Sequence, residues 1–225
     1  MNAPLLYAED LHLAYGSTSA LAGASVAVDA GELVAIMGRS GSGKSTLLHC
    51  LAGLLTPSRG AVVFDGKPLS ELSDRRRSSI RLRSMGFVFQ FADLVPELSL
   101  VENVALPLLV TGARRRDSFD RAREVLARVD IAELASRRPG QVSGGQLQRA
   151  AIARSLVHRP AIVFADEPTG ALDSVNSQLT LEALTQAARQ DGTAVVLVTH
   201  EARLASYCDR EIVIRDGRVG ELVSA

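Results

Sequence analysis

The sequence predicts an α/β fold that is interrupted by an α-helical insertion, and three observations support this prediction. Short apolar runs of strand length dominate residues 1–90 and return over residues 159–225. Over residues 91–158 the pattern changes to helices that carry Arg, Glu, Leu and Ala. One apolar run, residues 33–37, leads directly into a glycine-rich loop and a helix, as in α/β proteins. We therefore expect a single domain over residues 1–225, with an α/β core, a β-rich N-terminal part and a helical subdomain.

The individual strands and helices follow from local patterns along the chain. Apolar residues that alternate or cluster between glycine-containing turns predict a β meander at the start, and a later strand–helix–strand order predicts a βαβ unit. Gly53 and Pro57 are expected to end the first helix. The expected strands are residues 5–13, 24–28, 33–37, 61–64, 85–90, 161–165, 194–199 and 210–214. The expected helices are residues 46–55, 117–129, 146–157 and 179–189.

Length and composition limit the possible classes of protein. A chain of 225 residues buries a substantial core, and its 47% hydrophobic but 4% aromatic content predicts an aliphatic core, as parallel sheets have. The formal net charge is zero, so no nucleic acid is expected as a partner. Cys50 and Cys208 are too few for a disulfide framework, and we expect buried, reduced thiols. No segment reaches the roughly 18 apolar residues of a membrane span, so a membrane-spanning part is expected on a separate polypeptide.

The glycine-rich loop matches the phosphate-binding pattern G-x-x-x-x-G-K-[ST] in the letters GRSGSGKS. Its glycines allow backbone N–H groups to surround phosphate oxygens, and the helix that follows points its positive end toward them. We expect Lys44 to reach the β- and γ-phosphates and Ser45 to ligate Mg²⁺. The residues expected to bind nucleotide here are Gly38, Arg39, Ser40, Gly41, Ser42, Gly43, Lys44, Ser45 and Thr46.

Two adjacent acids, Asp166 and Glu167, follow the apolar run at residues 162–165. Ligands of open α/β sheets bind just beyond the strand ends. Asp166 suits Mg²⁺ binding, commonly through water, and Glu167 suits the orientation and polarisation of an attacking water. Acids at strand ends are also common turn residues, but their combination with a phosphate loop favours a hydrolytic site.

The letters SGGQ at residues 143–146 precede a long helix and offer a second phosphate-binding element. A hydroxyl, a flexible backbone and a helix N-terminus together suit an anion. The alternative is an ordinary helix N-cap, for which Ser and Gly are favoured. The continuation GGQLQRAAIARSL favours the phosphate-binding interpretation.

With GRSGSGKST, VSGGQ and IVFADEP in this order, the chain resembles the ATP-hydrolysing subunits of ATP-binding-cassette (ABC) systems over nearly its whole length. The resemblance implies a RecA-like P-loop NTPase core with an N-terminal antiparallel β subdomain, and it implies ATP and Mg²⁺ as cofactors. In that family the signature, here Ser143, Gly144, Gly145 and Gln146, touches the γ-phosphate of ATP on the other subunit. A head-to-tail dimer is therefore implied, either a homodimer or a heterodimer with a like ATPase.

The resemblance also implies roles for four further residues. Tyr15 matches the aromatic residue that stacks on adenine, although a half-buried strand aromatic is the alternative. Gln90 matches the glutamine that contacts Mg²⁺ and the water. Asp173 matches an aspartate that bridges the dimer interface, and His200 matches the histidine that contacts the γ-phosphate. All catalytic positions, namely Lys44, Gln90, Glu167 and His200, are intact, so we expect an active ATPase.

Departures from the family pattern are mild. Val142 replaces the usual Leu before the signature, and Ala171 stands where related proteins often have Asn. The segment FVFQFADLVPELSLVENVALPLLVTG and the run EPTGALDS resemble the lipoprotein-release, macrolide-export, antimicrobial-peptide-resistance and cell-division group. This implies an integral membrane permease as partner and a peripheral position on the cytoplasmic face of the cell membrane. Residues 91–110 match the segment where a coupling helix docks, with burial in the core as the alternative.

Other classes of function are open to a chain that carries these motifs. The same motor can regulate cell-wall hydrolysis in cell division without transport. ABC proteins that act on ribosomes or DNA usually carry two cassettes or a long coiled coil, and this chain has neither. A P-loop kinase or GTPase is disfavoured by SGGQ and by Glu167.

Two arginine triplets, at residues 75–77 and 114–116, are not explained by these motifs. The simplest interpretation is a solvated helix face or loop. The alternative is contact with a partner protein or with anionic lipid headgroups.

Overall fold

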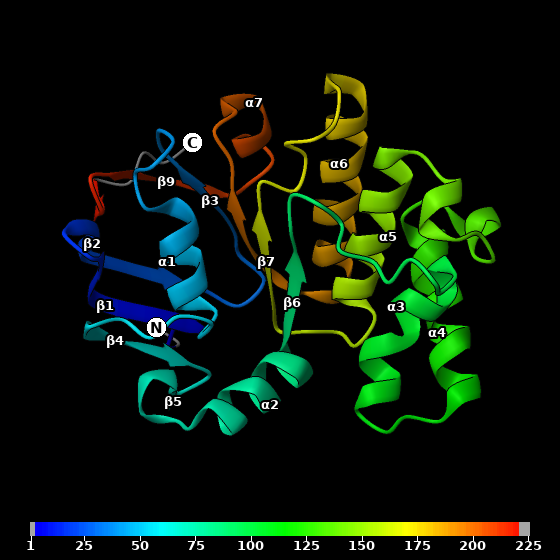
Figure 1. Cartoon of the computed structure of the whole chain (residues 1–225), viewed down its shortest axis with the longest axis horizontal. Coiled ribbons are helices and arrows are strands. Elements are labelled where there is room, and N and C mark those ends of the chain that lie inside the picture. The colour runs from blue at the N-terminus through cyan, green and yellow to red at the C-terminus, as the bar shows by residue number, and fades with distance from the viewer. Residues whose placement is uncertain (1–2, 221–225) are drawn as a thin grey trace.

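The computed structural model describes residues 3–220 and has the predicted α/β fold (Figure 1). A four-stranded antiparallel sheet has the order β2-β1-β4-β5, and a six-stranded sheet has the order β10-β9-β3-β8-β7-β6. In Figure 1 the antiparallel sheet lies at the left, the larger sheet crosses the middle, and α3, α4 and α5 form a separate helical part at the right. The expected β subdomain, core and helical insertion are therefore all present.

The antiparallel sheet is made by β1 (Leu6–Tyr15), β2 (Thr18–Val28), β4 (Arg59–Phe64) and β5 (Lys67–Pro68). Pairing of β1 with β2 runs from the Leu6–Val28 pair to the Tyr15–Thr18 pair next to the turn. Because this ladder continues to the turn, β2 begins six residues before the start expected from apolar clustering alone.

The larger sheet is parallel except for its last, short strand. Its strands are β3 (Leu33–Met37), β6 (Met85–Val88), β7 (Ile162–Asp166), β8 (Ala194–Val198), β9 (Arg210–Arg215) and β10 (Arg218–Val219). Alternate residues of β3 enter two different cores: Leu33 packs with residues of the helical part, and Val34 packs with α1 and the antiparallel sheet. Both faces are covered, which explains why these strands are continuous apolar runs.

Some helices begin or end at other residues than expected, because capping residues or tertiary contacts determine their ends. The α-helices are α1 (Lys44–Leu51), α2 (Asp74–Ser84), α3 (Leu100–Val110), α4 (Arg115–Arg128), α5 (Gly144–Leu156), α6 (Ser174–Asp191) and α7 (Ala202–Ala205). Short 3₁₀ turns occur at Leu69–Glu71, Ala132–Leu134 and Pro139–Gln141. Helix α6 begins five residues earlier than expected because the Asp173 carboxylate accepts the backbone N–H groups of Val175 and Asn176. No helix within residues 3–220 is both long and apolar enough to cross a membrane.

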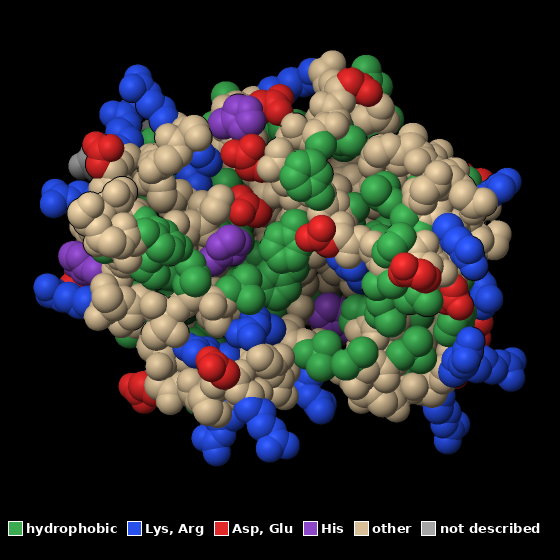
Figure 2. Space-filling model, viewed as in Figure 1, with side chains coloured by type: hydrophobic (Ala, Val, Ile, Leu, Met, Phe, Trp, Pro, Cys, Tyr) green, Lys and Arg blue, Asp and Glu red, His purple; other side chains and the backbone are tan. Residues whose placement is uncertain are grey.

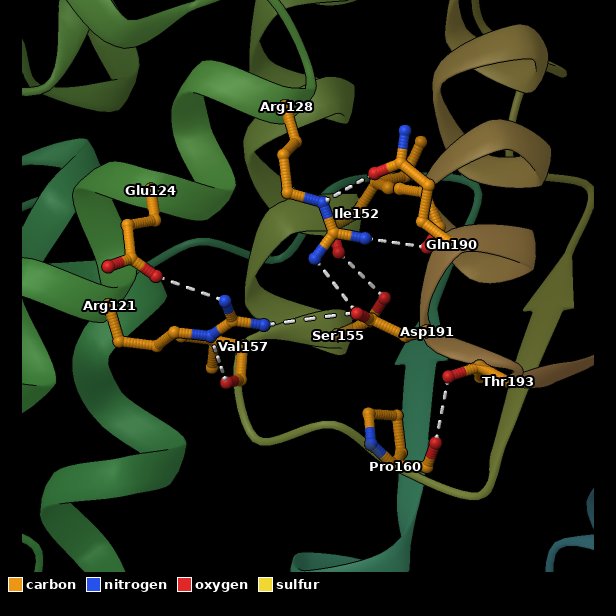
Figure 3. Close-up of polar contacts among 11 residues, drawn as sticks. Arg121, Glu124, Arg128, Ile152, Ser155, Val157, Pro160, Gln190, Asp191 and Thr193 are labelled. Carbon is orange, nitrogen blue, oxygen red and sulfur yellow. Dashed lines mark hydrogen bonds and ion pairs between the residues drawn. The ribbon is translucent and has the colours of Figure 1, made fainter.

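A polar cluster joins α4 of the helical part to the last turn of α6 (Figure 3). Arg128 donates to the Asp191 carboxylate at 2.8 Å and to the carbonyl oxygen of Ala187 at 2.7 Å. The Arg121 guanidinium lies 3.8 Å from the same carboxylate. All three charged side chains are largely buried, so the cluster fixes α4 against α6.

Candidate functional site

The phosphate-binding loop connects β3 to α1, as its sequence predicts. Gly43 has φ of +103°, and a Cβ atom there would lie 2.3 Å from the carbonyl oxygen of Ala20 in β2. No larger residue fits this position, because its Cβ would collide with backbone. The buried Lys44 amine donates to the carbonyl oxygens of Gly38 and Arg39, both at 3.0 Å. The amine is therefore held inside the curve of the loop.

Ser45 and Asp166 meet although they are far apart in the sequence. The Ser45 hydroxyl at the start of α1 donates to Asp166 Oδ1 at the end of β7, over 3.0 Å. His49, one turn further along α1, has its Nε2 3.8 Å from Asp166 Oδ2. Burial raises the pKa of Asp166, and the Ser45 hydrogen bond opposes that shift. A hydroxyl and a carboxylate oxygen side by side are ligands that Mg²⁺ prefers.

Glu167 and His200 come together at the neighbouring ends of β7 and β8. His200 Nδ1 lies 3.3 Å from Glu167 Oε2, with side chains that are 58% and 27% exposed. Glu167 has φ of +44°, and its backbone N–H donates to the carbonyl oxygen of Val198 at 3.0 Å. A positive φ is costly for a residue with a side chain, and such strained positions cluster at functional sites.

Ser45, His49, Asp166 and Glu167 border one cleft beside the phosphate loop. The cleft has a volume of about 490 Å³ and is lined by Ser40, Ser45, His49, Phe89, Gln90, Phe91, Asp93, Asp166 and Glu167. A second hollow on the other side of the loop is lined by Gly38, Arg39, Ser42, His200, Val213, Ile214, Arg215 and Asp216. The structure thus gathers the predicted loop, both strand-end acids, Gln90 and His200 along one edge of the sheet.

Two residues that the sequence interpretation missed hold the segment around Gln90. Gln148 of α5 donates to the carbonyl oxygen of Phe89 at 2.7 Å. Arg154, two turns later, donates to the carbonyl oxygens of Ala92 and Asp93. The feature that marks Gln148 as functional is its burial, because a buried polar side chain inside the helix that follows SGGQ needs a hydrogen-bond partner. Through these contacts α5 determines where the Gln90 loop lies.

The signature residues lie away from the phosphate loop of their own chain. Ser143 caps α5 in a reciprocal pair of hydrogen bonds with Gln146, so the N-cap alternative is correct as a local description. A Cβ at Gly145 would lie 2.7 Å from Asn176 Oδ1, which shows how closely α5 packs on α6 there. In Figure 1, α5 and α1 lie on opposite sides of β6 and β7. Asp173 caps α6 beside the signature, and its hydrogen bonds with Asn176 lower its pKa.

Tyr15 ends β1 with an exposed side chain, rather than the half-buried one of the alternative interpretation. The hairpin that carries it touches the phosphate loop, because Ala20 of β2 is the residue against which Gly43 packs. Tyr15 therefore belongs to the same side of the molecule as the loop. Its ring is free to contact a flat apolar group.

The fold and this edge of the sheet define a P-loop nucleotide-binding protein. The family model of the ABC transporter matches residues 21–170, and the chain belongs to this family. The chain is an ABC-type ATP-binding subunit and an ATPase that uses ATP with Mg²⁺, as the resemblance implied.

Individual relatives agree with the group expected from the sequence. The chain is 49% identical to the lipoprotein-releasing system ATP-binding protein LolD of Bordetella pertussis, over 96% of this chain and 95% of that protein. It is 44% identical to LolD 2 of Caulobacter vibrioides, over 97% and 98% of the two chains. A dimeric bacterial ABC transporter cassette, MJ0796, superimposes with a TM-score of 0.89 at 36% identity, over 97% of this chain and 98% of that one. The same cassette in a post-hydrolysis state with ADP and Pi gives a TM-score of 0.88 at 36% identity, over the same shares.

Proposed function

We propose that this chain is the ATPase of a lipoprotein-releasing ABC system and drives a separate membrane permease from the cytoplasmic face of the membrane. The LolD relatives support the substrate class, because identity extends over nearly the whole of both chains. The cell-wall regulatory alternative is not favoured by these relatives. The single observation that carries the chemistry is the meeting of Glu167 and His200 next to the Ser45–Asp166 pair.

The residues present fit a magnesium nucleotide. The backbone of neighbouring strands lies so close to Gly38 and Gly43 that neither position has room for a Cβ atom. The loop therefore keeps the tight curve that phosphate binding requires. Ser42 Oγ is buried and has no hydrogen-bond partner within residues 3–220, which leaves one polar atom of the loop available. Ser45 and Asp166 supply the oxygen ligands for Mg²⁺. Bound Mg²⁺ would neutralise charge on the β- and γ-phosphate oxygens.

The side chains of the site then divide the work of hydrolysis among them. Lys44 binds phosphate oxygens from within the loop, while Glu167 accepts a proton from the attacking water and orients it. His200, whose ring is more exposed than the Glu167 carboxylate, contacts the terminal phosphate and positions that carboxylate. Gln90 connects the water and the metal to the helical part, since α5 holds its loop through Gln148.

The signature and Asp173 serve the nucleotide of a second subunit in this proposal. Both are at helix N-termini that are already capped. The helices that they begin, α5 and α6, pack in a different core from α1, which follows the chain's own phosphate loop. The dimeric cassette relative supports a head-to-tail pair. We infer a homodimer, because this chain carries both halves of a composite site. Tyr15 stacks on the adenine, from the hairpin beside the loop.

A groove between α2 and α3 is the proposed docking site for the permease. It has a volume of about 440 Å³ and is lined by Ser78, Arg81, Leu82, Met85, Gly86, Phe87, Phe89, Pro107, Arg154, Ser155 and His158. Figure 2 shows hydrophobic side chains gathered between α2 and the helical part. Within residues 91–110, Leu100 and Val104 are core residues, whereas Phe91 and Val110 are exposed. The exposure of Phe91 and Val110 supports the coupling interpretation for the ends of that segment, and the burial of Leu100 and Val104 supports the core interpretation for its middle.

We also propose the domain division expected from the sequence, with residues 91–158 as the helical subdomain and residues 1–90 and 159–225 as the remainder. The grouping of α3, α4 and α5 supports it (Figure 1). Residues 1–2 and 221–225 lie outside the described part of the chain.

The test is to trap the Glu167→Gln protein with ATP in native membranes and identify co-purifying proteins by mass spectrometry. A permease with a large extracytoplasmic domain is expected, together with stoichiometric chain pairs. The matched control is Lys44→Ala, which cannot be trapped by nucleotide. Recovery with ribosomes or DNA and without a membrane protein would overturn the proposal.

A further inference from the structure

Arginine is concentrated on two segments that the ATPase chemistry does not use. Residues 71–83 contain five arginines and two acidic residues, and residues 111–116 contain three arginines and no acidic residue. The chain as a whole has a formal net charge of zero. A local excess of positive charge therefore lies on α2 and on the α3–α4 turn together with the first residues of α4.

The arginines of α2 divide into those that fix the helix and those that face solvent. Arg77 donates to Thr56 Oγ1 at 2.6 Å, and Arg81 donates to the carbonyl oxygen of Gly53 at 2.7 Å. Arg75, Arg76 and Arg83 are exposed. Within residues 3–220 no hydrogen bond or ion pair engages their guanidinium groups. The helix is thus held rigidly while it presents three unpaired cations.

The turn between α3 and α4 presents a similar surface. Arg114 is exposed, and its guanidinium has no ion pair within the described residues. Arg115 lies over the Phe119 ring at 5.3 Å, which keeps its positive charge at the surface. Val110, the last residue of α3, is 66% exposed. The turn therefore presents exposed guanidinium groups next to one exposed apolar side chain.

One segment lines the groove proposed for the permease, and the other follows a helix that lines it. Helix α2 contributes Ser78 and Leu82 to the lining, and α3, which precedes residues 111–116, contributes Pro107. In Figure 2, Lys and Arg side chains project from the lower edge of the molecule, below α2 and beyond the helical part. A membrane protein seated in the groove brings both arginine segments toward the bilayer.

We propose that α2 and the α3–α4 turn form a basic surface that binds anionic lipid headgroups on either side of the permease groove. Guanidinium groups bind phosphate oxygens in pairs of parallel hydrogen bonds, and they do so most strongly when no protein carboxylate occupies them. Several arginines together give the additive attraction known for polybasic segments near anionic leaflets. The orientation toward the bilayer rests on the proposed function, whereas lipid binding itself does not require the permease.

The test is co-sedimentation of the purified chain with vesicles at about 0.1 M salt. One set contains phosphatidylcholine alone, and the other contains one part phosphatidylglycerol to two parts phosphatidylcholine. The variant replaces Arg75, Arg76, Arg83 and Arg114 by Gln. The charge-matched control replaces Arg59, Arg138, Arg203 and Arg218, which lie on other elements, by Gln. Unchanged ATP affinity verifies the fold of both variants.

The wild type and the control should bind only the phosphatidylglycerol vesicles, and the variant should bind them about tenfold more weakly or worse. Equal binding by the variant and the wild type, equal loss in the control, or no binding by the wild type would each overturn the lipid surface. ATP turnover and nucleotide-dependent dimerisation are measured on the same samples. If turnover and dimerisation fail while vesicle binding is intact, the proposed function is refuted and the lipid surface is not.

Discussion

Two clusters of ionisable side chains in this molecule differ in how far the protein buries them. Around Asp191, the two guanidinium groups of Arg121 and Arg128 are directed at protein acceptors, and the carboxylate is 15% exposed (Figure 3). At the phosphate-loop edge, His200 is more than half exposed and meets Glu167 at 3.3 Å. The first cluster is largely buried among protein groups, with Arg121 Nη2 making no hydrogen bond within residues 3–220. In the second, Glu167 lines the cleft beside the phosphate loop and His200 lines the neighbouring hollow.

The difference in burial predicts that the Asp191 cluster stabilises the fold and that the Glu167–His200 pair acts on a ligand. A charge that is satisfied inside the protein contributes to the free energy of unfolding when its partners are removed. A charge that borders a cleft contributes mainly when a ligand arrives. Substitutions in the Asp191 cluster should therefore change stability, and substitutions at the phosphate-loop edge should change binding and turnover.

The largest expected effect is that of Lys44→Ala on nucleotide binding. Removing the ammonium group from the loop leaves phosphate charge without its partner, so ATP affinity should fall about a hundredfold or more. Calorimetric titration with ATP measures this. Lys67→Ala is the control, because Lys67 is exposed and pairs only loosely with Asp65 at 3.5 Å. Unchanged affinity in Lys44→Ala would contradict the phosphate-binding role.

Glu167→Gln should separate binding from hydrolysis. The amide keeps the shape of the side chain but accepts no proton, so turnover should fall by about a hundredfold or more while ATP still binds and drives dimerisation. Phosphate release and light scattering measure the two properties. Glu201→Gln, next to His200 in the sequence but absent from the cleft lining, should turn over normally. Normal turnover in Glu167→Gln would remove the general-base assignment.

Ser143→Arg should block turnover and leave ATP binding by the single chain within about twofold. The substitution also removes an N-cap, at a cost of about 1 kcal/mol. Ser99 offers a matched control, because it caps α3 by the same reciprocal hydrogen bonds, with Glu102. Ser99→Arg should lose similar stability and retain turnover. Poor ATP binding by the Ser143→Arg monomer would argue against a site completed by the partner subunit.

Much of the nucleotide site was predictable because it depends on local sequence. The β3 strand, the loop after it and the acids after β7 combine apolar runs with residues whose chemistry is position-specific. Which side chains contact one another was not predictable from the residues alone. Glu167 and His200 are brought together by the parallel pairing of β7 and β8, and Ser45 and Asp166 by the packing of α1 on the sheet.

Helix α2 shows why part of the fold could not be predicted. It contains no buried residue, so it lacks the apolar periodicity that identifies helices in a sequence. Contacts to Gly53 and Thr56, made by Arg81 and Arg77, hold it in place. The Asp173 cap was missed for a different reason. Asp173 lies six residues before Leu179, where the apolar periodicity begins, so the pattern of apolar residues does not reveal that its carboxylate caps α6.

The smallest functional effect is expected from Asp191→Asn, which tests the closed cluster. Arg121 and Arg128 would keep their contacts to backbone oxygens but lose a shared anion in a largely buried place. The free energy of unfolding should fall by about 1–3 kcal/mol, while ATP affinity stays within about twofold. Urea unfolding measures the loss. Asp120→Asn is the control, since its ion pair with Arg123 is more than half exposed and should contribute less than about 1 kcal/mol. Lost ATP binding with unchanged stability would reverse the assignment of the two clusters.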